Sequence, residues 1–72
     1  MKVEIHYCTE WHYEPSAASL AEELRSAFSV DAKLVPGHGG IFDVIVDGKL
    51  IFSKSETERF PETGEVVTKL NQ

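Results

Sequence analysis

The sequence contains little cysteine, has no excess of positive charge and contains no long apolar run. One cysteine among 72 residues excludes an internal disulfide and the cross-linked framework of small secreted domains. Seven Lys and Arg stand against twelve Asp and Glu, for a formal net charge of −5. The scattered basic residues form no stripe for phosphates, so we expect neither nucleic acid nor an anionic membrane surface as a partner. No run approaches the roughly 18 apolar residues of a membrane span.

The length indicates one small domain over residues 1–72. A chain of this size buries only about 60% of the surface that it exposes when unfolded, so its core is thin. No internal repeat, low-complexity tract or linker divides the sequence. No signal-peptide pattern is visible before the first strand-like residues, and we expect a cytoplasmic protein.

The first half predicts a strand, a helix and a second strand. Residues 2–7 alternate between apolar and polar, which is typical of a strand with one face on a core. Apolar residues then recur at helical spacing from Pro15 to Phe28 and predict a helix. We expect this helix to start between residues 14 and 20, and favour the earlier end of that range. Apolar and polar residues alternate again in 30–34, which predicts a second strand that ends at Pro36. Such a short strand-helix-strand unit is parallel with a right-handed crossover.

The second half predicts a hairpin and a final helix. Asp47-Gly48 separates two apolar runs, 41–46 and 49–53, and a two-residue type I′ turn fits this pair. The expected register places Ile45 opposite Leu50, Val44 opposite Ile51 and Asp43 opposite Phe52. Residues 53–60 are expected to form a loop, and Pro61 to open a helix that contains Gly64.

The resulting order is β-α-β-β-β-α, an α/β fold with a mixed four-stranded sheet and both helices on one face. The expected register leaves four large apolar side chains on the other face. Such a patch on a small domain indicates association, so we expect a homodimer or a partner contact there. The alternative is that these side chains merely shield the strands. The expected interface residues are Ile41, Ile45, Leu50 and Phe52.

Reactive side chains are concentrated in residues 7–15, between the first strand and the helix. This stretch holds the only cysteine, Cys8, the only tryptophan, Trp11, and two of the three histidines. Loops held between a rigid strand and a helix often carry function. A Cys-x-x-Cys here would indicate a thioredoxin-like redox loop, but this chain has Cys-x-x-Trp.

Three sequence blocks resemble the selenoprotein W-like (Rdx) family of thioredoxin-like proteins. They are Tyr7-Cys8-x-x-x-x-Tyr13-x-Pro15, the hairpin from Gly40 to Lys54, and Arg59-Phe60-Pro61. The resemblance covers nearly the whole chain and implies a thioredoxin-like sheet and a thiol-based redox role. The usual loop of the family is Cys-x-x-Cys or Cys-x-x-selenocysteine. Cys8 matches its first position, and Trp11 falls at the second.

Three interpretations of Cys8 are open. The first is a single redox thiol that is resolved by glutathione or by the thiol of a partner protein, since resolution within this chain needs a second sulfur. The second is a half-buried structural cysteine. The third is a metal ligand together with His6, His12 and His38, but their spacing matches no known tight motif. We therefore expect no metal and no cofactor.

Three other residues are candidates for binding. Trp11 either covers the core at the helix start or serves as a recognition residue, a common role of tryptophan at contacts. His12 is a cationic neighbour that would favour the Cys8 thiolate if it lies close. His38 lies among glycines, in a loop expected to approach the Cys8 loop, although such a histidine is commonly just solvated.

The leading hypothesis is therefore a small cytoplasmic redox protein that works through the Cys8 thiol alone. The alternative is a non-catalytic interaction module that uses the Trp11 loop and the uncovered sheet face.

Overall fold

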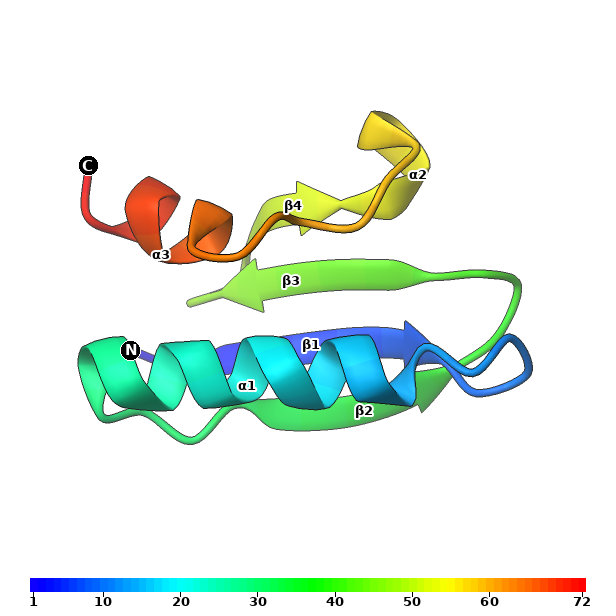
Figure 1. Cartoon of the computed structure of the whole chain (residues 1–72), viewed down its shortest axis with the longest axis horizontal. Helices are drawn as coiled ribbons and strands as arrows, with labels where there is room; N and C mark the ends of the chain where they lie inside the picture. Colours follow the sequence, from blue (N-terminus) through cyan, green and yellow to red (C-terminus); the bar gives the residue numbers. More distant parts are fainter.

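A four-stranded mixed sheet with helices on one face forms the protein, and the computed structural model describes all residues 1–72 (Figure 1). The strand order is β2-β1-β3-β4, with β1 parallel to β2 and antiparallel to β3, and β3 antiparallel to β4. This arrangement confirms the predicted α/β fold with a mixed sheet. The elements are β1 (Val3–Cys8), α1 (Glu14–Phe28), β2 (Lys33–Gly37), β3 (Phe42–Val46), β4 (Lys49–Ser53), α2 (Lys54–Thr57) and α3 (Glu65–Leu70).

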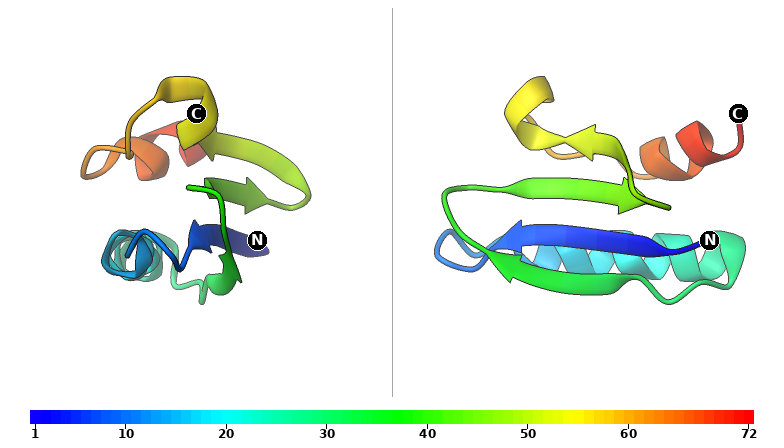
Figure 2. Two further views of the ribbon diagram at one scale, coloured as in Figure 1. Left: turned by 90° about the vertical axis from the view of Figure 1, so that its right-hand side faces the viewer. Right: turned by 180° about the vertical axis from the view of Figure 1, so that it is seen from behind.

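Helix α1 crosses one face of the sheet between β1 and β2. It begins at Glu14, with Pro15 in its first turn, and ends at Phe28, after which Ser29 caps it with a left-handed φ of 56°. The early start is the predicted one, because proline in the first turn forfeits no helical hydrogen bond. Figure 2 shows α3 on the same face as α1. None of the helices has both the length and the apolar character needed to cross a bilayer.

The core lies between this helical layer and the inner face of the sheet. Alternation along β1 and β3 turns one set of side chains inward, while Glu4, His6, Asp43 and Ile45 stay partly exposed. The inner helix face adds three residues at helical spacing. The buried core consists of Val3, Ile5, Tyr7, Ala17, Leu20, Leu24, Phe42, Val44, Val46, Phe52 and Val66.

The predicted hairpin turn is confirmed, but the predicted register of β4 is wrong beyond Leu50. Ile45 pairs with Leu50 as expected, whereas Val44 pairs with Phe52 and leaves Ile51 as an extra residue at an irregularity in the ladder. Such a bulge puts two residues opposite one and reverses the alternation beyond it. Phe52 is therefore 2% exposed in the core, and the predicted placement of Phe52 on the uncovered face is wrong.

Two further boundaries differ from the prediction. Strand β2 begins at Lys33 and continues through Pro36 to Gly37, because β2 is an edge strand, where a missing N–H is tolerated. The predicted loop 53–60 contains the one-turn helix α2. The last helix begins at Glu65 and not at Pro61, and Gly64 caps it with a φ of 81°.

Candidate functional site

The only cysteine lies at the end of β1, where β1 and β2 both finish. Cys8 has no exposed surface. Its N–H donates to the carbonyl of Ile41 at 2.8 Å, and its carbonyl accepts from the N–H of Tyr13 at 3.2 Å. The backbone around Cys8 is therefore held both by the residue that precedes β3 and by the residue that precedes α1.

Two loops meet beside Cys8, the Cys8 loop (Thr9–Tyr13) and the glycine loop (Gly37–Gly40). The N–H of Thr9 donates to the Gly37 carbonyl at 3.1 Å, and the Thr9 hydroxyl donates to the same oxygen at 3.2 Å. The N–H of Gly39 donates to a Glu10 carboxylate oxygen at 3.4 Å. The expected approach of these two loops is thus confirmed, and Figure 1 shows them at the same end of the sheet.

The indole of Trp11 packs against the glycine loop. A Cβ placed on Gly40 would lie 2.5 Å from the Trp11 ring, and Gly40 has a φ of 78°. A glycine meets both demands, since it has no Cβ and adopts positive φ readily. Trp11 nevertheless remains 59% exposed, so part of the indole is supported by Gly40 and much of the rest is open to solvent.

A series of aromatic contacts joins Trp11 to the core. Trp11 meets Tyr13 edge-on at 6.1 Å between ring centroids, Tyr13 meets Phe60 at 4.7 Å, and Phe60 meets the buried Phe42 at 5.2 Å. The Lys54 ammonium lies 5.6 Å from the Tyr13 ring. Edge-to-face pairs of this kind stabilise beyond the area that they bury. The Tyr13 end of the Cys8 loop is therefore attached to the core.

The histidines do not gather around Cys8. His12 and His38 are both exposed, and His12 has a left-handed φ of 60°. His6 contacts Glu4 instead, with 3.0 Å between Nε2 and Oε1, and this hydrogen bond holds the pKa of Glu4 below its ordinary value. No group of three or more His, Cys, Asp or Glu side chains is placed to hold a metal ion.

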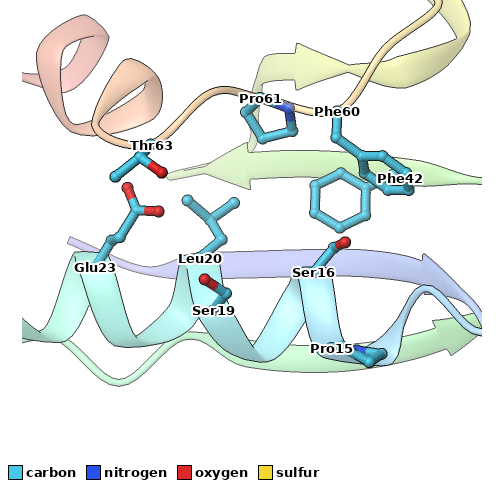
Figure 3. A pocket seen from close by; sticks show the side chains of 9 residues that line it. All are labelled: Pro15, Ser16, Ser19, Leu20, Glu23, Phe42, Phe60, Pro61 and Thr63. Carbon is cyan, nitrogen blue, oxygen red and sulfur yellow. The ribbon is translucent and has the colours of Figure 1, made fainter.

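A separate hollow of about 260 Å³ lies between α1 and the segment before α3 (Figure 3). Figure 3 shows Phe42 and Phe60 at one end of it and Glu23 beside Thr63 at the other. Glu23 already accepts a hydrogen bond from the N–H of Gly64 at 2.8 Å. None of the predicted site residues lines this hollow. The three sequence blocks that resemble the family contain four of its lining residues, Pro15, Phe42, Phe60 and Pro61. These blocks lie far apart in the chain and do not by themselves indicate a shared hollow.

The remaining predicted site residues belong to a different surface. Ile45 and Leu50 pair across β3 and β4 on the uncovered sheet face, and Leu50 is 50% exposed. Ile41 is half-buried and precedes β3, next to the glycine loop. The structure thus brings Cys8, Trp11, His12 and His38 to one pair of adjoining loops, and leaves Ile45 and Leu50 on the sheet.

Comparison with known proteins agrees with this architecture. Residues 2–72 match the model of the Rdx family. A solved structure from Bordetella parapertussis superposes with a TM-score of 0.90 at 32% identity, covering 97% of this chain and 92% of that one. A selenoprotein W-related protein from Vibrio cholerae superposes with a TM-score of 0.90 at 27% identity, covering 97% and 91%. No curated protein matches this chain.

Proposed function

Because this chain belongs to the Rdx family, a family of small thioredoxin-like proteins of redox type, we propose that Cys8 acts as a single redox thiol in the cytoplasm. The observation that carries this proposal is the position of Cys8. It ends β1 and precedes the loop into α1, which is where strand and helix hold reactive groups most rigidly. The partner is an external thiol or disulfide, either glutathione or a partner protein.

The reaction is thiol–disulfide exchange between molecules. The Cys8 thiolate, having lost its proton to solvent, attacks one sulfur of a disulfide such as oxidised glutathione, forming the mixed disulfide and releasing one glutathione thiolate. A thiolate of a partner protein then attacks the glutathione sulfur of the mixed disulfide and frees the Cys8 thiolate, so that the glutathionyl group passes to the partner's cysteine. The chain has one cysteine, so every resolving sulfur comes from outside.

The burial of Cys8 limits this reaction. A disulfide must reach the Cys8 sulfur along a line of attack, and Cys8 exposes no surface. The segments that cover the Cys8 sulfur must therefore move before the mixed disulfide forms. Local openings of this kind occur in folded proteins at a free-energy cost below that of global unfolding.

Intact mass spectrometry after treatment with oxidised glutathione tests the proposal. We expect the native wild-type protein to gain one glutathionyl group, which reduced glutathione removes, and Cys8→Ser to gain none. A wild-type protein that gains no adduct while folded, but gains one in denaturant, would contradict the redox role.

A non-catalytic interaction module is the second candidate. It is favoured by the contrast between Trp11, which is 59% exposed, and Cys8, which is not exposed at all. An exposed tryptophan held by its neighbours is the type of residue that dominates protein contacts. In this case the native protein stays unmodified by oxidised glutathione, and Cys8→Ser keeps every function that Trp11→Ala loses.

A further inference from the structure

We propose that the side chain of Ile41 covers the Cys8 sulfur, and that the thiol is reached from the uncovered face of the sheet when this side chain moves aside. The inference rests on the proposed function only in taking Cys8 as the reacting group. It makes Ile41 a positioning residue that controls access to the thiol.

Cys8 is fully buried, but it does not belong to the core between the sheet and the helices. It is the one buried apolar residue outside the core cluster. Alternation along β1 turns Ile5 and Tyr7 toward the helices. It turns Cys8 to the opposite face, together with Glu4 and His6, and the helices leave this face uncovered (Figure 2). The helical layer therefore does not cover the sulfur.

The neighbours of Cys8 in the sheet identify Ile41 as the cover. On the β2 side Cys8 pairs with Gly37, which has no side chain. On the β3 side the register places Ile41 beside Cys8, and the Cys8 N–H donates to the Ile41 carbonyl at 2.8 Å. Along β1, the His6 ring is hydrogen-bonded at 3.0 Å to Glu4, the neighbour on the side away from Cys8.

The Ile41 side chain extends across Cys8 toward β2. A Cβ placed on Gly37 would lie 2.9 Å from Cγ2 of Ile41, although β1 runs between β2 and β3. Because Cys8 occupies the position between Gly37 and Ile41, this approach takes the Ile41 side chain over the thiol. The missing Cβ of Gly37 leaves room for it, a common reason for glycine inside a strand. Ile41 is half-buried, so the cover itself faces solvent on its outer side.

A side chain in this place can uncover Cys8 without a break in the backbone. Its rotation leaves the hydrogen bond between the Cys8 N–H and the Ile41 carbonyl intact. Such a rotation is also faster than local unfolding of the strands. A disulfide then approaches Cys8 from the uncovered sheet face, and neither the Cys8 loop nor the glycine loop has to open.

The experiment compares the rate at which iodoacetamide alkylates the single cysteine in folded wild-type, Ile41→Ala, Ile41→Val and Ile45→Ala proteins. Ile45 is the matched control, because it is a half-buried isoleucine on the same face of the sheet. Valine at position 41 keeps the branched methyl group that lies against Gly37. We expect Ile41→Ala to alkylate at least about tenfold faster than Ile45→Ala, and Ile41→Val to stay close to wild type, as for an opening that is about 1.4 kcal/mol easier in Ile41→Ala alone.

Two corrections make these rates comparable. The rates are taken on the high-pH plateau, where the thiol is fully ionised in every variant. Urea unfolding gives the globally unfolded fraction of each variant, whose contribution is subtracted. Equal corrected rates in Ile41→Ala and Ile45→Ala would overturn the inference, as would an Ile41→Val protein that alkylates as fast as Ile41→Ala.

Hydrogen exchange in the wild-type protein provides the test if Ile41→Ala does not fold. Exchange of the Cys8 amide requires its hydrogen bond to Ile41 to break, whereas rotation of the Ile41 side chain does not. Relative to an unfolded peptide, we expect alkylation of Cys8 to be slowed at least about tenfold less than exchange of its amide. Equal slowing would show that the backbone must open, and would overturn the inference.

These outcomes are separate from those that test the redox role. Alkylation needs no redox partner, so faster alkylation of Ile41→Ala supports the covering role even if oxidised glutathione forms no adduct. Conversely, a wild-type protein that forms the adduct, with equal alkylation of Ile41→Ala and Ile45→Ala, retains the redox role of Cys8 and loses the covering role of Ile41.

Discussion

At the scale of single residues, Phe52 and Leu50 show how one irregularity in a strand changes two side chains. Both lie on β4, but Phe52 is 2% exposed and Leu50 is 50% exposed. The bulge at Ile51 brings the phenyl ring into the core, where a large aromatic side chain buries more apolar area than isoleucine does. Substitution of Phe52 should therefore lower the free energy of unfolding more than substitution of Leu50.

We expect Phe52→Ala to lower the free energy of unfolding by about 3–5 kcal/mol, because it leaves a cavity in a thin core. Leu50→Ala is the control on the same strand and should change it by less than about 0.5 kcal/mol. Urea titrations followed by circular dichroism measure both values. Similar effects at the two positions would show that β4 lacks the bulge.

A second residue-scale feature is the pair formed by Arg59 and Glu65. The two guanidinium nitrogens donate to the two carboxylate oxygens at 2.7 and 2.8 Å, and the Glu62 N–H donates to one of the same oxygens at 2.9 Å. The Arg59 bonds, followed by the Glu62 N–H, lower the pKa of Glu65 from 4.5 to about 2. The pair joins the segment before α3 to the first residue of α3.

The pairing of Arg59 and Glu65 predicts that the difference in the free energy of unfolding between wild type and Glu65→Gln depends on pH. Because the folded-state pKa lies below the ordinary value, Glu65 stabilises the fold above pH 4.5 and loses this contribution as the pH falls toward about 2. Glu65→Gln should therefore be less stable than wild type at pH 7, with a difference that narrows over this window. Urea titrations across the window measure it.

Glu56→Gln is the control for this prediction, since Glu56 is exposed on α2. The stability difference between Glu56→Gln and wild type should not narrow as the pH falls. The pKa of Glu4 is also lowered, by its hydrogen bond to His6, but that contribution is common to all three proteins and cancels in the comparison. The pairing would be contradicted if Glu65→Gln remained less stable than wild type by the same free energy of unfolding down to pH 2.

At the scale of elements, the β3–β4 turn has both local and tertiary support. Asp47 and Gly48 have positive φ values of 50° and 82°, as a type I′ turn requires. The turn is also attached to the start of the chain, because Asp47 donates its N–H to the Lys2 carbonyl at 2.8 Å and accepts the Lys2 N–H at 2.9 Å.

Gly48→Ala should destabilise the protein by about 1–2 kcal/mol through left-handed strain alone. The space around Gly48 is open, so no clash adds to this cost. Gly48→Asn is the control, because asparagine tolerates this conformation better than alanine does. Thermal unfolding should rank wild type first, Gly48→Asn second and Gly48→Ala last, and the reverse order of the two variants would exclude strain as the cause.

At the scale of the whole molecule, the helices cover one face of the sheet and leave the other uncovered (Figure 2). With Phe52 in the core, the predicted interface residues that remain on this uncovered face are Ile41, Ile45 and Leu50. Only Leu50 of these is strongly exposed. The proposed homodimer therefore has less apolar surface available than the sequence alone indicated, and any association should be correspondingly weak.

We expect sedimentation velocity at micromolar to submillimolar concentrations to show a reversible monomer–dimer equilibrium. Leu50→Asp should shift it fully to monomer without lowering the free energy of unfolding by more than about 0.5 kcal/mol. Phe52→Asp cannot serve as this test, because Phe52 is 2% exposed and a carboxylate there would unfold the core. A wild-type protein that stays monomeric over the whole range would remove the homodimer proposal.

The sequence by itself determined the features that depend on neighbouring residues. The alternation in residues 2–7, the helical spacing after Glu14 and the Asp47-Gly48 turn each express a local periodicity or a local φ preference. The parallel strand-helix-strand unit and the antiparallel hairpin followed from these elements, whereas the strand order β2-β1-β3-β4 was established only by the structure. Resemblance to a family then identified Cys8 as the candidate residue.

Only the tertiary structure decided where several decisive side chains lie. Three features depend on how the sheet and the helices pack against one another. They are the side of β4 on which Phe52 lies, the inclusion of Pro36 in an edge strand and the start of α3 at Glu65. The burial of Cys8 and the support of Trp11 by Gly40 join segments about thirty residues apart. Packing between distant segments leaves no periodic trace in the sequence, because it depends on shape in three dimensions.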